Sequence, residues 1–300
     1  ANQDAALYSF TTLCSASTLE YTNVPRPQMG PQVRPPALAG KFYPADATEL
    51  QRTIDSMVPA TAVEKKPWRA AMVPHAGLRF SGRIAGETLA RVELPDTIIV
   101  IGPKHTAAGM NHAIAPHATW SLPGITIPSD IELAQTLAQT LPDLQLDAAA
   151  HQNEHGIEVV LPFLHRFAPQ SRVIGIALGR GEWELCERIG EGLAQVIGAR
   201  QDRILLVISS DMNHFAEDAE NRRRDELAMT ALESLEPRTV LETVRKNEIS
   251  MCGVIPACAI LHGLSKMAPL QRAERVAYAT SADVSGDKSR VVGYCGMLFE

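Results

Sequence analysis

Long apolar runs are absent from this sequence of 300 residues, and none approaches the roughly 20 residues that cross a bilayer. Dense tracts of lysine and arginine are absent as well, and the formal net charge is −6. A surface that follows nucleic-acid phosphates needs a basic patch. These two absences argue against a membrane partner and against a nucleic-acid partner.

Cysteines are few and scattered, without any C-x-x-C pair, and they stand at Cys14, Cys186, Cys252, Cys258 and Cys295. A disulfide framework is not expected from such a set in so long a chain. The first residues also lack the basic and apolar regions of a secretory signal. We therefore expect a protein of the reducing cytoplasm.

Apolar residues make up 45% of the sequence, as in globular domains with a large core. The patterns predict strands at 70–74, 97–101, 172–178, 204–209, 274–280 and 291–299. They predict helices at about 46–58, 82–92, 129–141, 183–197, 221–234, 238–247 and 254–266. The alternation indicates one α/β domain over residues 38–300, with a central mixed or parallel sheet flanked by helices. Residues 1–37, rich in Ser, Thr, Pro and Gln, are expected to form an extended arm or tail.

Three of the predicted strands are followed closely by a histidine, namely His75, His105 and His214. In α/β folds the ligand crevice lies outside the carboxyl ends of the strands. A single histidine is more often a structural residue, but histidines after successive strands favour metal ligands, because neutral imidazole is the commonest protein ligand. The sequence therefore predicts a metal or acid/base site assembled from distant segments.

Cys252 precedes an apolar helix that Pro256 is suited to begin. At a helix N-terminus the free N–H groups and the dipole favour the thiolate, which binds metals. The alternative is a small buried apolar residue, as most free cysteines are. Cys258 and Cys295 fit that alternative better, since they lie inside an apolar helix and an apolar strand.

The densest polar cluster at a strand end is Ser209-Ser210-Asp211-Met212-Asn213-His214. This cluster is typical of a general base with a carboxylate that orients it, so we assign these roles to His214 and Asp211. The alternative is an aspartate helix cap beside a surface histidine.

A second polar cluster spans residues 151–158. Its H-x-x-x-H spacing could place two ligands on one helix face, but the adjacent Glu of zinc hydrolases is missing and Gly156 disfavours a stable helix. We expect His155 and Glu158 to line the site and polarise a substrate, with His151 taking no part.

These motifs, at 74–77, 102–105, 154–158, 209–214 and 251–253, occur in the order and spacing of the Memo family. The resemblance covers residues 38–299, and the bacterial and archaeal members are called AmmeMemoRadiSam system protein B. The family is similar in fold to class III extradiol dioxygenases such as protocatechuate 4,5-dioxygenase, which carry a nonhaem iron site.

The resemblance implies that His75, His105 and Cys252 are metal ligands, and that His214 matches the acid/base histidine of the dioxygenases. Those enzymes use two histidines and a carboxylate. A thiolate in place of the carboxylate is a softer donor, which accepts Fe(II) but also Cu(I) or Zn. Gly156 is a further departure, because the family commonly has Ser there.

Three functions follow as hypotheses. The first is a mononuclear nonhaem iron oxidoreductase, dioxygenase-like, that uses O₂ on a small-molecule substrate. The second is a non-catalytic adaptor with a vestigial site, since the family name implies association with radical-SAM and AMMECR1-like proteins. The third is a zinc-dependent hydrolase whose nucleophile is a metal-bound water.

Overall fold

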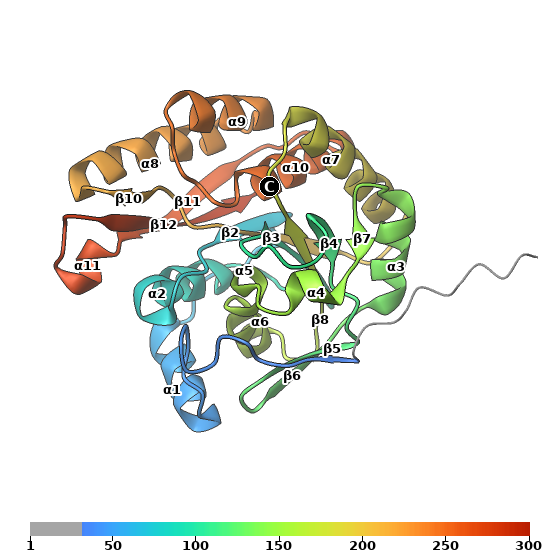
Figure 1. The fold of residues 1–300 in the computed structure, drawn as a ribbon, viewed down its shortest axis with the longest axis horizontal. Helices are drawn as coiled ribbons and strands as arrows, with labels where there is room; N and C mark the ends of the chain where they lie inside the picture. Colours follow the sequence, from blue (N-terminus) through green and yellow to red (C-terminus); the bar gives the residue numbers. More distant parts are fainter. Residues whose placement is uncertain (1–31) are drawn as a thin grey trace, which may run out of the picture.

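The computed structural model describes residues 32–300 of the chain (Figure 1). Its strands are β1 (Val33–Arg34), β2 (Ala70–Val73), β3 (Thr97–Pro103), β4 (His112–Ile114), β5 (Thr119–Leu122), β6 (Ile125–Pro128), β7 (Gln145–Leu146), β8 (Arg172–Leu178), β9 (Ile204–Ser209), β10 (His214–Ala216), β11 (Ala273–Thr280) and β12 (Val291–Phe299). Its helices are α1 (Ala47–Met57), α2 (Leu78–Leu89), α3 (Ile131–Thr140), α4 (Ala148–His151), α5 (His155–Glu158), α6 (Leu161–Phe167), α7 (Trp183–Gly198), α8 (Asp218–Glu233), α9 (Pro237–Lys246), α10 (Val254–Met267) and α11 (Ala282–Ser285).

The main sheet has nine strands, in the order β10-β12-β2-β9-β3-β8-β4-β7, with β11 paired to β12. Its centre is parallel, because β2 pairs with β9, β9 with β3 and β3 with β8 in the same direction. Antiparallel strands flank this centre, with β12 beside β2 and β4 beside β8. A separate small sheet joins β1, β5 and β6. The main sheet is therefore mixed, with a parallel core whose carboxyl ends share one edge.

Helices cover both faces of the main sheet, as Figure 1 shows with α7 to α10 above it and α1, α2 and α6 below. The central strands are buried on both sides, and alternate residues enter different cores. In β2, for example, Met72 packs into the core under α7 and α10, whereas Val73 packs into the core of α2 and α6. This double burial explains why the central strands are continuous apolar runs in the sequence.

The close approach of α7 and α10 needs glycine at the crossing. A Cβ atom on Gly190 would lie 2.7 Å from the Ala259 carbonyl oxygen, and one on Gly263 would lie 2.6 Å from the Gly190 carbonyl oxygen. The two backbones therefore touch directly, and this packing fixes α10 against the sheet. Cys252 is held in the turn that leads into that helix.

The predicted fold class is confirmed: the protein is a single α/β domain whose mixed sheet is flanked by helices. The predicted strands 172–178, 204–209 and 291–299 have the bounds of β8, β9 and β12. The helix predicted at 82–92 begins earlier, at Leu78, and Gly82 lies inside it, where a Cβ would be 2.4 Å from Met57 Sδ. The short elements β4 to β7 and α4 to α6 were not predicted.

The predicted arm lies mostly outside the described residues, which begin at residue 32. Its last part belongs to the packed domain, because β1 pairs in parallel with β5 and the Arg34 side chain is only 1% exposed. The expected boundary at residue 37 therefore falls after the first packed strand.

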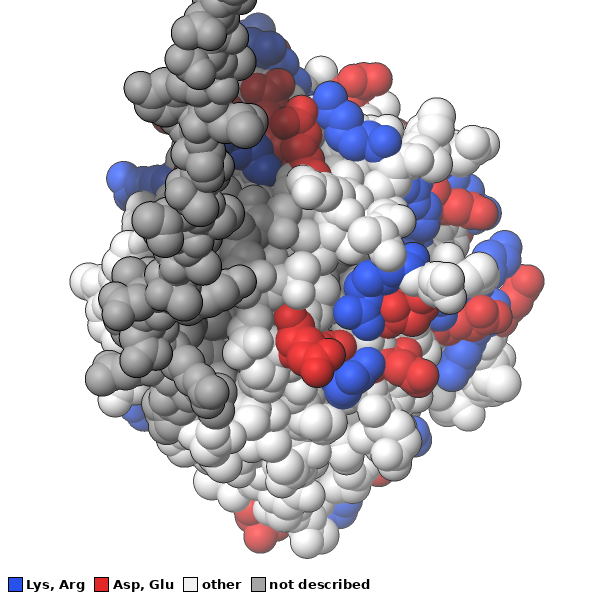
Figure 2. All heavy atoms as spheres, turned by 90° about the vertical axis from the view of Figure 1, so that its right-hand side faces the viewer, with Lys and Arg blue, Asp and Glu red and all other residues white. Residues whose placement is uncertain are grey.

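Among the described residues, no helix has both the length and the apolarity to cross a membrane. The face in Figure 2 carries basic and acidic side chains next to one another over its right-hand part.

Candidate metal centre

His75, His105 and Cys252 come together at the carboxyl edge of the main sheet. His75 follows β2, His105 follows β3, and Cys252 lies just before α10. One ligand atom from each residue lies within 4.8 Å of the others. Nε2 of His75 is 3.4 Å from Sγ of Cys252, and the two imidazole rings meet edge to face with centroids 5.2 Å apart.

The His75 ring is fixed by Ser209 at the end of β9. Nδ1 of His75 is 2.8 Å from Ser209 Oγ, and that hydroxyl donates its own proton to the Gly156 carbonyl. The hydroxyl can therefore only accept from the ring, so Nδ1 carries the proton and Nε2 keeps its lone pair. Burial lowers the pKa of His75, which also favours the neutral ring.

The His105 ring is fixed in the same way by Glu154. Nδ1 of His105 is 2.7 Å from Glu154 Oε1, and the backbone N–H of His105 donates to Oε2 at 2.6 Å. Burial alone would raise the pKa of Glu154, but these bonds and one from the Gly156 N–H bring it down to about 2. A carboxylate can only accept, so His105 also carries its proton on Nδ1 and leaves Nε2 free.

Cys252 is held by the segment that follows β9. Its Sγ accepts the backbone N–H of Asp211 at 3.2 Å, and the Gly253 N–H donates to Ser210 Oγ at 2.9 Å. Without a bound ion, burial and the nearby Asp211 carboxyl raise the pKa of the thiol. Without an ion the thiol is therefore the expected form, because desolvation outweighs the hydrogen bonds that Sγ accepts.

This arrangement fits a metal ion. Two Nε2 lone pairs and one sulfur converge, and each ring nitrogen that faces away is held by a protein acceptor, which is the usual arrangement around metal-binding histidines. Metal binding deprotonates a cysteine ligand, so the raised pKa of Cys252 makes the affinity strongly pH-dependent. Three protein ligands leave room for others, and the His105 side chain is 29% exposed.

His155 lies beside this cluster as expected. Its ring stacks on His105 with centroids 4.0 Å apart and meets His75 edge to face at 5.2 Å. Burial, followed by the neighbouring His105, lowers the pKa of His155. His155, His105 and Glu154 also form a second group whose ligand atoms lie within 4.8 Å of one another.

His214 is positioned by Ser250, not by Asp211. Its Nδ1 donates to the Ser250 carbonyl at 3.0 Å, and its backbone N–H donates to Ser250 Oγ at 2.8 Å. Asp211 instead accepts the backbone N–H of His75 at 2.8 Å, and no hydrogen bond joins it to His214 within residues 32–300. The prediction that Asp211 orients the His214 imidazole is therefore wrong; Asp211 anchors the His75 loop.

The residue after His214 adopts an unusual backbone conformation. Phe215 has φ of 68°, which a bulky side chain rarely adopts, and it is 60% exposed. The Arg290 guanidinium lies 4.5 Å from the centroid of its ring.

The prediction that Glu158 binds substrate is wrong. Its side chain is fully buried and accepts hydrogen bonds from Arg34, from the Tyr43 hydroxyl and from the backbone N–H groups of Ala37 and Leu38. These donors use the acceptor capacity of the carboxylate. Glu158 therefore ties the first described segment to α5 and does not face a ligand.

His151 takes no part in the cluster, as expected. It is buried, its Nε2 donates to the Ala113 carbonyl at 3.1 Å, and its own carbonyl accepts from Arg34.

Sequence reasoning missed Glu154, Ser209 and Ser250 as positioning residues, and it missed Arg34 as the partner of Glu158. Glu154 had a signal, since it is an acid next to His155 in a motif that was already singled out. Ser209 also had one, since it begins the polar cluster 209–214, whereas Ser250 and Arg34 gave none, because their partners are distant in the sequence.

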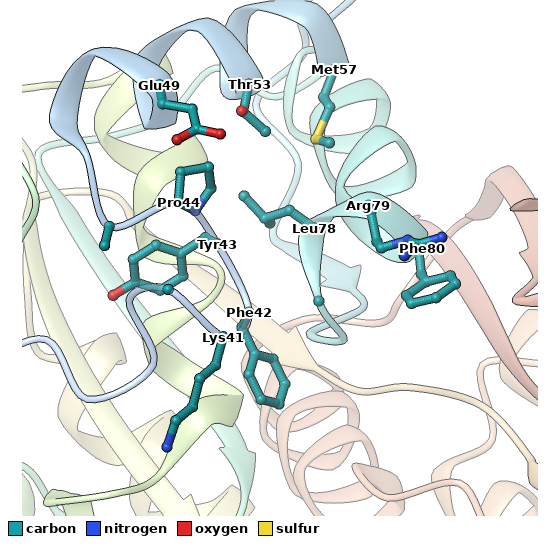
Figure 3. A pocket seen from close by; sticks show the side chains of 13 residues that line it. Lys41, Phe42, Tyr43, Pro44, Glu49, Thr53, Met57, Leu78, Arg79 and Phe80 are labelled. Carbon is teal, nitrogen blue, oxygen red and sulfur yellow. The ribbon is translucent and has the colours of Figure 1, made fainter. Parts of the chain in front are cut away.

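A cavity of about 660 Å³ lies between α1, the start of α2 and the loop before α1 (Figure 3). The loop 40–45, one side of α1 and the start of α2 line it, with Phe42 at one end and Thr53 and Met57 at the other. The Phe42 ring contacts His155, with centroids 4.9 Å apart, and Gly77 in the cavity wall is two residues from His75. The cavity therefore reaches the neighbours of the cluster, but His75, His105, Cys252 and His155 do not line it.

Comparison with known proteins gives one family. The model of Memo-like proteins matches residues 34–298. A MEMO1 family protein of Aquifex aeolicus is 35% identical over 269 residues, covering 89% of this chain and 99% of its own. Similar proteins of Methanopyrus kandleri and Ignicoccus hospitalis are 32% and 34% identical over 89% of this chain and 98% of theirs.

A crystal structure of an uncharacterized protein from Escherichia coli K12 is similar in fold alone. It superposes with a TM-score of 0.51 at 15% identity, covering 76% of this chain and 98% of that chain.

Proposed function

The chain belongs to the Memo family, and on that premise we propose that it is a mononuclear nonhaem iron protein that oxidises a small molecule with O₂. One observation carries the proposal: one ligand atom each of His75, His105 and Cys252 lies within 4.8 Å of the others, while the Nδ1 atom of each ring is held by a protein oxygen. A structural histidine has no need of a lone pair oriented in this way.

The donor set favours a first-row metal. Imidazole suits iron, copper and zinc, and a thiolate is a softer donor than the carboxylate of the two-histidine iron sites. We propose Fe(II) as the native ion, with zinc or copper as the alternatives. His75, His105 and Cys252 would hold the ion, which would supply the redox chemistry for the reaction with O₂.

The residues around the ligands supply the remaining chemistry. Because His214 carries a proton on Nδ1 toward Ser250, its Nε2 can accept a proton from a bound molecule. We propose His214 as the general base and acid of the reaction. His155, stacked on His105 and in contact with Phe42, would contact and polarise the substrate.

The test measures metal binding and O₂ consumption on the same preparations. Protein prepared anaerobically is titrated with Fe(II), Zn(II) and Cu(I), and the Fe(II) form is then assayed for O₂ uptake with small aromatic and thiol compounds. His214→Phe should keep the metal and lose activity by about 10²–10⁴-fold, the usual contribution of a general acid/base.

Loss of metal in His214→Phe would make His214 a ligand and overturn this division of roles. Zinc binding with hydrolytic activity and no O₂ uptake would favour the hydrolase. Absence of metal binding in a folded protein that binds a protein partner would favour the adaptor.

A further inference from the structure

A series of hydrogen bonds leads from His214 to α8, which packs over β10, β11 and β12 (Figure 1). Nδ1 of His214 lies 3.0 Å from the Ser250 carbonyl oxygen. The Ser250 backbone N–H donates to Oδ1 of Asn213 at 3.0 Å, and Nδ2 of Asn213 donates to Oδ1 of Asn221 at 2.8 Å. Nδ2 of Asn221 donates in turn to Oδ2 of Asp225 at 2.9 Å. These five residues, the His214–Asp225 network, therefore connect an imidazole to a carboxylate.

The two ends of the network fix the direction of every bond in it. A carboxylate only accepts, so Asn221 must turn its NH₂ group to Asp225. At the other end, the Ser250 N–H only donates, so Asn213 must turn its oxygen toward it. The Ser250 carbonyl only accepts, so Nδ1 of His214 carries a proton. All donors of the network therefore point toward Asp225.

The Asp225 carboxyl is closely enclosed at the end of the network. It is buried, and it also accepts from the Asn213 backbone N–H at 2.7 Å and from the Tyr278 hydroxyl at 2.6 Å. A Cβ on Gly293 of β12 would lie 1.8 Å from Oδ2, so any side chain there would displace the carboxyl. Burial raises the pKa of Asp225 to about 6, so the group is ionised at pH 8.

A carboxylate at the end of such a network strengthens each bond in it. Buried hydrogen bonds in series polarise one another, because an amide that donates to an anion becomes a better acceptor at its oxygen. In Ser-His-Asp triads, an aspartate in direct contact holds the histidine in one tautomer and stabilises its protonated form. Asp211 does not contact His214 in this way, because it accepts the backbone N–H of His75. The Nδ1 side of His214 is connected instead to Asp225.

We propose that Asp225 is a positioning residue for His214. Through the side-chain amides of Asn221 and Asn213, it holds the imidazole in the tautomer with the proton on Nδ1, so that Nε2 can take a proton from the substrate. This inference rests on the proposed function, because it takes His214 as the general base. The hold on the ring is nevertheless a property of the protein alone and can be measured without a substrate.

The test compares two buried acids of α8, each changed to its amide, in Asp225→Asn and Asp218→Asn. Asp218 accepts from Thr280 and Arg222, which lie outside the network. An amide in place of Asp225 must turn its NH₂ group toward a donor of one of the neighbouring asparagines, so it interrupts the network. Asp218→Asn leaves the network intact and is the matched control.

The first readout is the tautomer of His214 at pH 8. It is read from ¹H–¹⁵N spectra of the metal-free full chain with ¹⁵N-labelled histidines, in which His214→Phe identifies the signals. The parent and Asp218→Asn should show the Nδ1–H form, and Asp225→Asn should show both forms. Asn221→Ala interrupts the network and leaves Asp225 its other two donors, so it should match Asp225→Asn and takes its place if that variant does not fold. Urea unfolding shows which variants are folded.

The second readout is O₂ uptake by the Fe(II)-loaded protein with catechol. Asp225→Asn should lower kcat by about 10–100-fold, a part of the about 10²–10⁴-fold that a general base contributes. The KM for O₂ and the Fe(II) affinity should stay unchanged, since the metal ligands keep their own partners. Asp218→Asn should keep the kcat of the parent.

The same single tautomer in the parent, in Asp225→Asn and in Asn221→Ala would overturn the inference, as would a parent whose His214 carries its proton on Nε2. An equal change of tautomer in Asp218→Asn would also overturn it, because the effect would then belong to the buried acids of α8 in general. A parent that shows the expected tautomers but no O₂ uptake would contradict the proposed function alone.

Discussion

Two polar clusters lie close together around α5, and they use their atoms differently. Around Glu158, every strong acceptor position faces a donor of the protein, including the Arg34 guanidinium. Around His75 and His105, one nitrogen of each ring is held by a protein oxygen, and Nε2 of His75 meets the Cys252 thiol at 3.4 Å, a group that a metal ion would deprotonate. The first cluster is complete without a ligand, whereas the second is complete only with one.

The contrast is sharpest between two acids of the same motif. Glu154 accepts from the His105 ring and so aims its free nitrogen, whereas Glu158, one helical turn later, holds the segment that contains Arg34. The comparison teaches that burial and charge do not identify a ligand site. What identifies it is the set of acceptor atoms that the protein itself leaves unused.

The largest expected effect is on stability, from Glu158→Ala. This change leaves the Arg34 guanidinium buried without its anion, which costs about 3–5 kcal/mol in the free energy of unfolding. Glu242→Ala is the control, because its pair with Arg238 is exposed and should contribute under about 1 kcal/mol. Urea unfolding of both variants measures the difference, and equal losses would show that the Glu158 cluster is not a structural tie.

A pH-dependent effect is expected from Asp225, a buried carboxyl that accepts hydrogen bonds from the Asn213 N–H and the Tyr278 hydroxyl. Burial raises the pKa of Asp225 to about 6, so the folded protein holds this proton where the unfolded chain, with a normal pKa of about 4, has lost it. The contribution of this group to stability is therefore present below about pH 4 and is lost as the pH rises to about 6, by up to about 3 kcal/mol. The difference in unfolding free energy between the parent and Asp225→Asn should follow that trend from pH 4 to 7. A difference that does not change with pH would contradict the raised pKa.

A smaller effect, now on the metal, is expected from Glu154→Gln. The amide offers one acceptor where the carboxylate offers two, so the His105 ring is held less firmly and is a weaker donor. Fe(II) affinity should fall about 10–100-fold, which is typical when a metal-ligating histidine loses the group that accepts a hydrogen bond from its other ring nitrogen. Anaerobic titration measures it, with Glu158→Gln as the matched control: it should lower stability and keep the affinity. If Glu158→Gln lowered the Fe(II) affinity and Glu154→Gln lowered only the stability, the roles assigned to the two acids would be wrong.

The smallest effect is expected at Phe215. Glycine adopts a positive φ without the cost of about 1–2 kcal/mol that an L side chain carries there, and the exposed ring loses little burial. Phe215→Gly should therefore raise the unfolding free energy by about 1 kcal/mol at most, measured by urea unfolding. A loss of more than about 1 kcal/mol would mean that the contact with Arg290 outweighs the strain.

The sequence predicted the long elements well because strands buried on both faces and amphipathic helices leave strong patterns, as β8, β9 and β12 show. The short strands β4 to β7 have two to four residues each, too few for a period to be read. His75, His105 and Cys252 were identified by their motifs, and the structure brings them together as expected. Glu158 was misassigned because its partner Arg34 lies 124 residues away, where no pattern in the motif could point to it.

The central claim is that His75, His105 and Cys252 hold a metal ion, and Fe(II) titration of cysteine variants tests it most directly. Cys252→Ala removes the only anionic donor of the set. The Fe(II) affinity should therefore fall further than the about 10–100-fold that is typical when a ligating histidine loses its hydrogen-bond partner. Cys258→Ala and Cys295→Ala, which change buried cysteines elsewhere in the core, should leave the affinity unchanged. The same Fe(II) affinity in Cys252→Ala as in the parent would contradict the assignment.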